Sequence, residues 1–138
     1  MPKILRFGVA MDEGLLARFD RLIREQKYGS RSEAIRDLVR RDLVSREWEE
    51  EREVAGAITL IYDHHQRALM ARLTSIQHDY GTLILSAQHI HLDHHHCLEI
   101  IALRGSSKDA LRLADRLKAV KGVKHGTLSM SSTGKGLE

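Results

Sequence analysis

The apolar positions in the first third of the chain change from strand spacing to helical spacing. Residues 5–11 place an apolar side chain at every second position, which is typical of a short strand with one apolar side: Phe7, Val9 and Met11. Asp12 then stands where the N-cap of a helix belongs, and Ser30 with Glu33 has the form of a capping box before a second apolar stripe. This region therefore predicts one strand followed by two helices.

The pattern after residue 54 is that of a mixed domain of strands and helices. Its elements follow in the order strand, helix, strand, strand, helix, strand, over residues 57–62, 66–76, 82–92, 97–103, 107–120 and 124–131. Arg104-Gly105-Ser106 predicts a turn between the third strand and the second helix. This order is the split βαβ arrangement of a ferredoxin-like domain, so we expect an α+β fold.

A densely charged segment separates the two patterns. Residues 45–53 are polar apart from Trp48, which predicts the solvated end of a helix and a hinge. We therefore expect a βαα domain at residues 1–48, a linker at 49–54, a ferredoxin-like domain at 55–133 and a tail at 134–138.

The strand predicted at residues 5–11 has no partner strand within its own domain. A single strand with two helices cannot complete a sheet ladder, whereas the same strand from a second copy would supply one. The product would be an antiparallel two-stranded ribbon with two-fold symmetry, which fits the major groove of DNA. The sequence therefore predicts a dimeric DNA-binding domain.

The distribution of charge supports this division. The formal net charge is +3, and residues 1–48 hold 11 Lys and Arg against 8 Asp and Glu, so they contain the whole excess. A basic region of this kind favours a polyanionic partner. No apolar run approaches the roughly 20 residues of a membrane span, and one cysteine excludes an internal disulfide. We expect a cytoplasmic protein without a membrane partner.

The histidines point to a metal. All nine lie between residues 64 and 125, together with the single cysteine. His89 and His91 would project from the same face of a strand. Cys97 joins that face for only one parity of register: pairing residue 91 with residue 97 works, pairing it with residue 96 does not, and the connection therefore needs an odd number of residues. Two imidazoles and a thiolate suit Ni, Cu or Zn rather than Mg or Ca, and His78 could supply a fourth ligand.

The segment from Arg6 to Leu43, and especially GSRSEAIRDLVRR at residues 29–41, resembles the ribbon-helix-helix family of dimeric DNA-binding domains. The resemblance implies that the outward strand residues read base edges: Arg6, Gly8 and Ala10. It also implies that the start of the second helix, at Ser30, Arg31 and Ser32, holds a phosphate, as free N–H groups and the helix dipole would favour. Because Gly8 and Ala10 have no side-chain donor, Arg6 would provide most of the polar readout.

The whole chain resembles the nickel-responsive transcriptional regulators, the NikR family. The motifs that carry this resemblance are SRSEAIRDL, Gln77-His78, His89-Ile90-His91, Cys97-Leu98-Glu99-Ile100 and Gly122-Val123-Lys124-His125-Gly126. The family implies one square-planar Ni(II) per subunit, held by His89, His91 and Cys97 of one chain and His78 of another. It further implies a homotetramer, a dimer of dimers in which ACT-like ferredoxin-like domains form the centre.

Further residues have candidate roles beside this site. Tyr62, His64 and Glu99 are candidates to orient the ligands through hydrogen bonds. In the family, carboxylates at the positions of Glu33 and Asp37 help to hold a second, hard cation such as K⁺ between the two domains. The remaining histidines, 94 to 96 and 125, are expected to be structural or to form weak metal sites.

These observations predict a metal-gated regulator. Ni(II) would promote binding to a palindromic operator and so repress or otherwise control nickel transport genes, with the protein associated with the nucleoid when bound to DNA. The alternative is a metal-independent ribbon-helix-helix regulator whose ACT-like domain senses another ligand or partner. An enzyme is not expected, because four protein ligands leave no open position on the metal.

Overall fold

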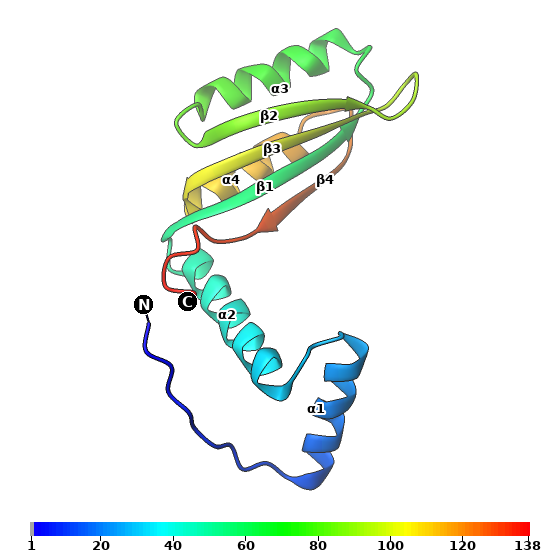
Figure 1. The fold of residues 1–138 in the computed structure, drawn as a ribbon. Helices are drawn as coiled ribbons and strands as arrows, with labels where there is room; N and C mark the ends of the chain where they lie inside the picture. Colours follow the sequence, from blue (N-terminus) through cyan, green and yellow to red (C-terminus); the bar gives the residue numbers. More distant parts are fainter. Residues whose placement is uncertain (1) are drawn as a thin grey trace. The chain divides into compact units, whose positions relative to one another are not determined.

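The computed structural model describes residues 2–138, which form two compact units. One unit comprises the chain up to Leu43 together with Gly136–Glu138, and the other comprises Val44–Lys135. The elements, labelled in Figure 1, are α1 (Glu13–Glu25), α2 (Arg31–Glu49), β1 (Glu53–Tyr62), α3 (Arg67–Asp79), β2 (Ile84–His91), β3 (Cys97–Ser106), α4 (Ser107–Lys118) and β4 (Val123–Met130). No helix in the described part of the chain is long and apolar enough to cross a membrane.

Both helices predicted in the N-terminal unit are confirmed, and side chains cap them as expected. Asp12 Oδ2 accepts hydrogen bonds from the backbone N–H groups of Gly14 (3.0 Å) and Leu15 (3.3 Å) at the start of α1. At α2, Ser30 Oγ accepts the N–H of Glu33 at 3.2 Å. The Glu33 carboxylate reaches back one residue further than a capping box requires, to the N–H of Gly29.

The strand predicted at residues 5–11 does not form in the single chain. Its residues have no ladder partner, and its apolar side chains lie open to solvent, with Phe7 76% and Val9 57% exposed. A lone strand leaves its backbone donors and acceptors without partners, so extended chain is the expected state of one copy. Pairing with a second copy stays a prediction.

The C-terminal unit is a four-stranded antiparallel sheet with two helices. The strand order is β2-β3-β1-β4, so β1 lies at the centre and β2 at an edge. Alternate residues of β1 and β3 are buried, and the same cluster contains the apolar side of both α3 and α4. Both helices therefore cover one face of the sheet, as the split βαβ order predicts.

The turn predicted at residues 104–106 is wrong. Strand β3 continues to Ser106, which pairs with Glu53, and α4 begins at the next residue. The reason is that β1 starts four residues before the predicted strand and so provides partners for the end of β3. Gly105 is needed for space, because a Cβ there would lie 2.4 Å from Leu83 Cδ1.

The prediction of a solvated hinge at residues 45–53 is wrong for Trp48. Its side chain is only 4% exposed and belongs to the core of the C-terminal unit. The indole N–H donates to the carbonyl of Ser131 at 2.8 Å, and Ser107 Oγ donates to the Trp48 carbonyl at 2.9 Å. The end of α2 thus packs with the sheet domain, because a large aromatic ring gains from burial while its charged neighbours on the helix stay at least partly exposed.

Candidate metal centre

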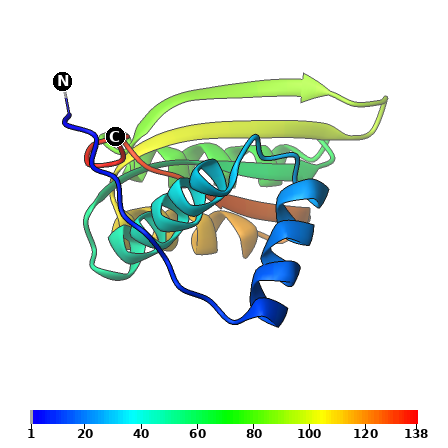
Figure 2. The same cartoon turned by 60° about the horizontal axis from the view of Figure 1, so that its bottom comes forward.

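The register of the β2–β3 hairpin sets the geometry of the candidate site. His91 pairs with Cys97 and His89 pairs with Glu99, so the hairpin has the parity that the proposed metal site requires. The connection comprises residues 92–96, an odd number, and the hairpin and its turn are visible in Figure 2. Both imidazoles, the thiol and the Glu99 carboxylate consequently share the face of the sheet that the helices cover.

The turn itself is closed by one carboxylate. Asp93 Oδ1 accepts the backbone N–H groups of His95 and His96, each at 2.8 Å. The His96 ring also bonds to this carboxylate, and these hydrogen bonds, that of the ring first, lower the pKa of Asp93 to about 2. The loop between the two predicted ligand strands is therefore held by a permanently charged acceptor.

A buried hydrogen-bond network lies behind His89 and Cys97. Glu99 is 1% exposed, and its carboxylate accepts hydrogen bonds from Tyr62 Oη (2.5 Å) and Gln77 Nε2 (2.8 Å). His89 Nδ1 lies 3.2 Å from the Tyr62 hydroxyl and 4.0 Å from Cys97 Sγ. The arrangement fixes one imidazole and the thiol beside each other through residues on three strands and one helix.

Burial and the hydrogen bond to Glu99 raise the pKa of Tyr62, so its phenol remains a donor at neutral pH. The sequence did not predict Gln77 as a site residue, although Gln77-His78 is one of the motifs that carry the family resemblance. Its place in the network follows from helix α3 packing over the strands, which spacing along the chain does not show.

His64 adjoins the second strand imidazole. Its ring stacks on that of His91 with centroids 4.5 Å apart and an angle of 3° between planes. Desolvation, followed by the charges of neighbouring histidines, lowers the pKa of His64. Its Nδ1 is buried and has no hydrogen-bond partner within the described residues. An unpartnered buried nitrogen beside the candidate ligand His91 fits a site in which a further group completes the contacts.

The four predicted ligands do not meet in one chain. His78 is exposed in the last turn of α3, and among the described residues these donors do not form a group within 4.8 Å of one another. The His89 side chain is 48% exposed and so accessible from outside the chain. This geometry suits a site that needs a ligand from a second copy.

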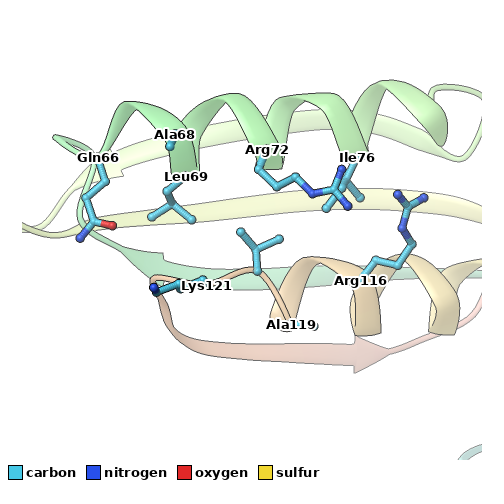
Figure 3. Close-up of a pocket in the computed structure, with 9 residues that line it drawn as sticks. Gln66, Ala68, Leu69, Arg72, Ile76, Arg116, Ala119 and Lys121 are labelled. Atoms are coloured by element: carbon cyan, nitrogen blue, oxygen red, sulfur yellow. The ribbon is translucent and has the colours of Figure 1, made fainter.

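A groove between α3 and α4 has a volume of about 610 Å³ (Figure 3). Apolar and basic side chains line it, among them Leu69, Arg72, Arg116 and Lys121. None of the predicted metal donors lines this groove, so it does not contribute to the candidate metal centre.

The predicted DNA contacts lie on the surface of the N-terminal unit. Arg6, Gly8 and Ala10 are exposed, and so are Ser32 and Arg31 at the start of α2. Ser30 Oγ is occupied as the helix cap. The Arg31 guanidinium makes two hydrogen bonds to Asp20, both of 2.9 Å, so a phosphate would have to share or displace that carboxylate.

The two carboxylates predicted to hold a hard cation already have partners in the N-terminal unit. Glu33 accepts the Gly29 N–H. Asp37 accepts a very short hydrogen bond from Tyr28 and pairs with Arg41 Nε at 3.0 Å. This hydrogen bond raises the pKa of Tyr28. A cation there would compete with these contacts.

The buried phenol gives a pH prediction. Because the pKa of Tyr62 is raised above its unfolded value of about 10, its stabilising effect is complete below that pH and is lost as pH rises further. Replacing Tyr62 with Phe should cost about 1–3 kcal/mol at pH 7, since Glu99 loses a donor. Urea unfolding at pH 7 and at alkaline pH should show a smaller alkaline loss in this variant than in wild type. Equal alkaline losses would contradict the assignment.

Comparison with known proteins identifies both units. Residues 55–131 match the model of the NikR C terminal nickel binding domain, and residues 6–44 match that of the ribbon-helix-helix proteins of the copG family. A solved structure of an uncharacterized protein from Thermotoga maritima has a TM-score of 0.51 and 12% identity, and covers 56% of this chain and 95% of its own. That likeness concerns the fold alone.

The chain also has similar relatives over nearly its full length, each with the name "Putative nickel-responsive regulator". The protein of Syntrophus aciditrophicus is 55% identical over 97% of this chain and 98% of its own, and that of Chlorobium limicola is 52% identical over 97% and 100%. The protein of Nitratidesulfovibrio vulgaris strain Miyazaki F is 51% identical over 99% of both chains. The chain is a DNA-binding transcription regulator and not an enzyme, and it belongs to the nickel-responsive regulators of the NikR family.

Proposed function

We propose that this protein is a nickel-gated regulator in which His89, His91 and Cys97 of one subunit and His78 of another hold Ni(II). The observation that carries the proposal is the pairing of His91 with Cys97, which places two imidazoles and a thiol on one face of the hairpin. Bound nickel would increase affinity for a palindromic operator that controls nickel transport genes. The regulator would act in the cytoplasm, associated with the nucleoid when bound to DNA.

The donor set favours a late first-row divalent ion. A thiolate and three imidazoles suit Ni(II), Cu(II) or Zn(II), and the affinity order alone would favour Cu(II). A planar arrangement of four donors would favour nickel over zinc. The buried Glu99 and Tyr62 would support this selection by fixing the orientation of His89, because hydrogen bonds to ligands set their direction and basicity. His64 would support His91 in another way, by stacking on its ring.

We propose a homotetramer, a dimer of dimers with one nickel per subunit. The exposed position of His78 makes it available to another copy. The face of the sheet opposite the helices carries apolar side chains that are only half-buried: Ile61, Ile90, Leu98 and Ile100. A second copy packed there would remove apolar surface from water. Metal binding would then depend on assembly, because the ligands come from more than one chain.

The N-terminal unit would bind DNA as a paired ribbon. Two copies of residues 5–11 would complete each other's ladder and bury the exposed Phe7 and Val9. Arg6, Gly8 and Ala10 would then face the groove, and the N-terminus of α2 at Ser30, Arg31 and Ser32 would bind a backbone phosphate.

The proposed function requires operator binding to depend on nickel. Operator binding at fixed salt should tighten with stoichiometric Ni(II) by about 5–150-fold, the usual size of a coupling of 1–3 kcal/mol. His89→Ala and Cys97→Ala should abolish this gain because each removes a proposed ligand, whereas His125→Ala should retain it. A direct titration of labelled operator DNA measures all four proteins. Equal binding with and without nickel would instead favour a metal-independent regulator that senses another ligand or partner.

Substitution of Arg6 separates readout of the base sequence from general attraction to DNA charge. Arg6→Ala should weaken operator binding by about 5–150-fold, the value of a bidentate contact to guanine. Its affinity for unrelated DNA should change much less. Lys3→Ala removes the same charge outside the predicted strand and should weaken both affinities alike. The readout assignment fails if Arg6→Ala lowers both by the same factor.

We further propose that Glu33 and Asp37 bind a hard cation such as K⁺, since their carboxylates lie one turn apart on α2. Asp37→Ala should then reduce nickel-dependent operator affinity and its dependence on K⁺. Tyr28→Phe removes the hydrogen bond to Asp37 and leaves the carboxylate, so it should retain the K⁺ dependence. Unchanged operator affinity in Asp37→Ala, measured with K⁺ and with a large organic cation, would eliminate this site.

A further inference from the structure

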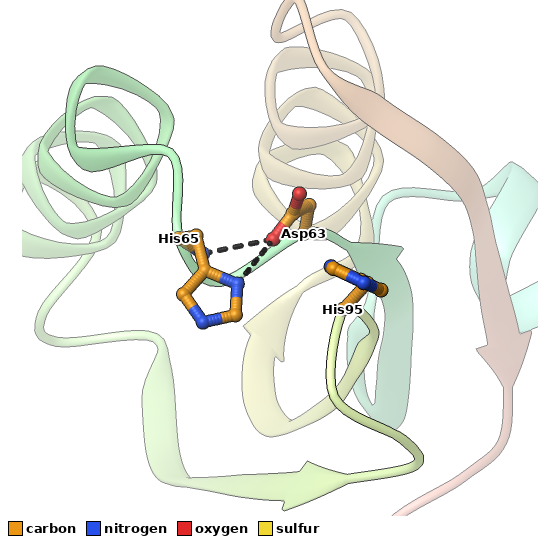
Figure 4. A group of neighbouring side chains, drawn as sticks. All are labelled: Asp63, His65 and His95. Atoms are coloured by element: carbon orange, nitrogen blue, oxygen red, sulfur yellow. Dashed lines mark hydrogen bonds and ion pairs between the residues drawn. The ribbon is translucent and has the colours of Figure 1, made fainter.

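Two loops bring a second set of metal-binding side chains together, apart from the ligands proposed above (Figure 4). Asp63 and His65 lie between β1 and α3, and His95 lies in the β2–β3 turn. One potential ligand atom of each residue lies within 4.8 Å of the others. We propose that Asp63, His65 and His95 form a second site for a divalent transition metal.

The distances within this group suit a shared ion. Asp63 Oδ1 lies 3.1 Å from His65 Nδ1 and accepts the backbone N–H of His65 at 2.9 Å. Ligand bonds of about 2.0–2.2 Å place two ligands of one ion roughly 3–3.5 Å apart. A metal ion can therefore replace the proton between the Asp63 oxygen and the His65 nitrogen without movement of the backbone. Only His95 has to approach, by rotation of an exposed side chain.

Both loops are anchored close to the ligands. The hydrogen bond from the His65 backbone to Asp63 fixes the first loop. The hydrogen bond from the His95 backbone to Asp93, at 2.8 Å, fixes the second. The turn thus places His95 near the other two ligands. Binding a metal there costs less conformational entropy than ordering a free loop would.

Further imidazoles surround the site. The His65 ring lies 4.3 Å from that of His64 and 5.3 Å from that of His94, and the His94 and His95 rings are 4.9 Å apart. These neighbours raise the local density of nitrogen donors. By contrast, His96 is held by Asp93 and by Lys124, whose Nζ lies 2.7 Å from its Nε2.

The chemistry of the group defines the ion. Two imidazoles and one carboxylate suit Zn(II), Co(II), Ni(II) or Cu(II), and water would occupy the remaining positions. Without a thiolate, and with three protein ligands instead of four, this site should bind more weakly than the one proposed for nickel. It would fill at higher free metal.

The position of the site links it to the first one. Asp63 follows Tyr62 in the chain, and His95 stands two residues before Cys97. His64, between the two ligands of the first loop, stacks on His91. Occupancy would tie the β1–α3 loop to the hairpin turn beside the nickel ligands. The existence of the site does not depend on nickel gating.

The test uses the full chain with His89→Ala and Cys97→Ala combined, which removes the first site. Calorimetric titration with Zn(II) should find one equivalent per chain. Adding His65→Ala or His95→Ala should lower the affinity for Zn(II) about tenfold or more, because each removes a direct ligand. Adding His125→Ala, which removes a histidine outside the cluster, should leave it unchanged.

Nitrogen-15 spectra of the histidine rings identify the ligands independently. The ring nitrogens of His65 and His95 should shift on addition of diamagnetic Zn(II), and those of His125 should not. If the variant with His89→Ala and Cys97→Ala binds no equivalent of Zn(II), the proposal is wrong. So would an equal loss of affinity in His94→Ala, which would indicate a diffuse histidine patch. Failure of nickel gating would appear separately, as nickel-independent operator binding with the zinc equivalent intact.

Discussion

The candidate metal centre depends on one buried carboxylate. Glu99 is buried on the inner strand β3, where a polar group is costly unless hydrogen bonds replace the lost water. Tyr62 from β1 and Gln77 from α3 provide those hydrogen bonds, and His89 from β2 lies beside them. The strands β1, β2 and β3 and the helix α3 must therefore all be in place before this carboxylate has its hydrogen-bond partners. The same contacts orient His89, so the requirement that permits the burial of Glu99 also positions a proposed ligand.

The second constraint is the parity of the hairpin. A shift of one residue between β2 and β3 would turn His89 and His91 of β2 to the opposite face from Cys97 and Glu99, which the pairing of β3 with β1 keeps in the core. Asp93 prevents this by closing a turn of fixed length through the backbone of His95 and His96. The turn that sets the register therefore also presents His95 to the loop of Asp63 and His65, so one short segment serves both proposed sites.

The two units differ in what a single chain can complete. The C-terminal sheet has its own core, and its helices cover one face. The N-terminal unit has capped helices but an unpaired strand segment. In the C-terminal unit, His78 is exposed and does not join the other proposed ligands in one group. Each unit thus leaves one requirement to a second copy: backbone partners for residues 5–11 and a fourth ligand for nickel. Assembly is the common condition for DNA binding and metal binding in the proposed function.

The sequence by itself determined the order of elements from residue 12 onward and the helix caps at Asp12 and Ser30, because these follow from local spacing, and it named the hairpin parity that a metal site would require. It also carried the family resemblance that the matches to both domains confirm. Only the tertiary structure decided the burial of Trp48, the extension of β3 through Gly105, the role of Gln77 and the meeting of Asp63 with His95. These features join residues distant in the chain, and local spacing contains no information about which side chains the packing of helices and loops brings together.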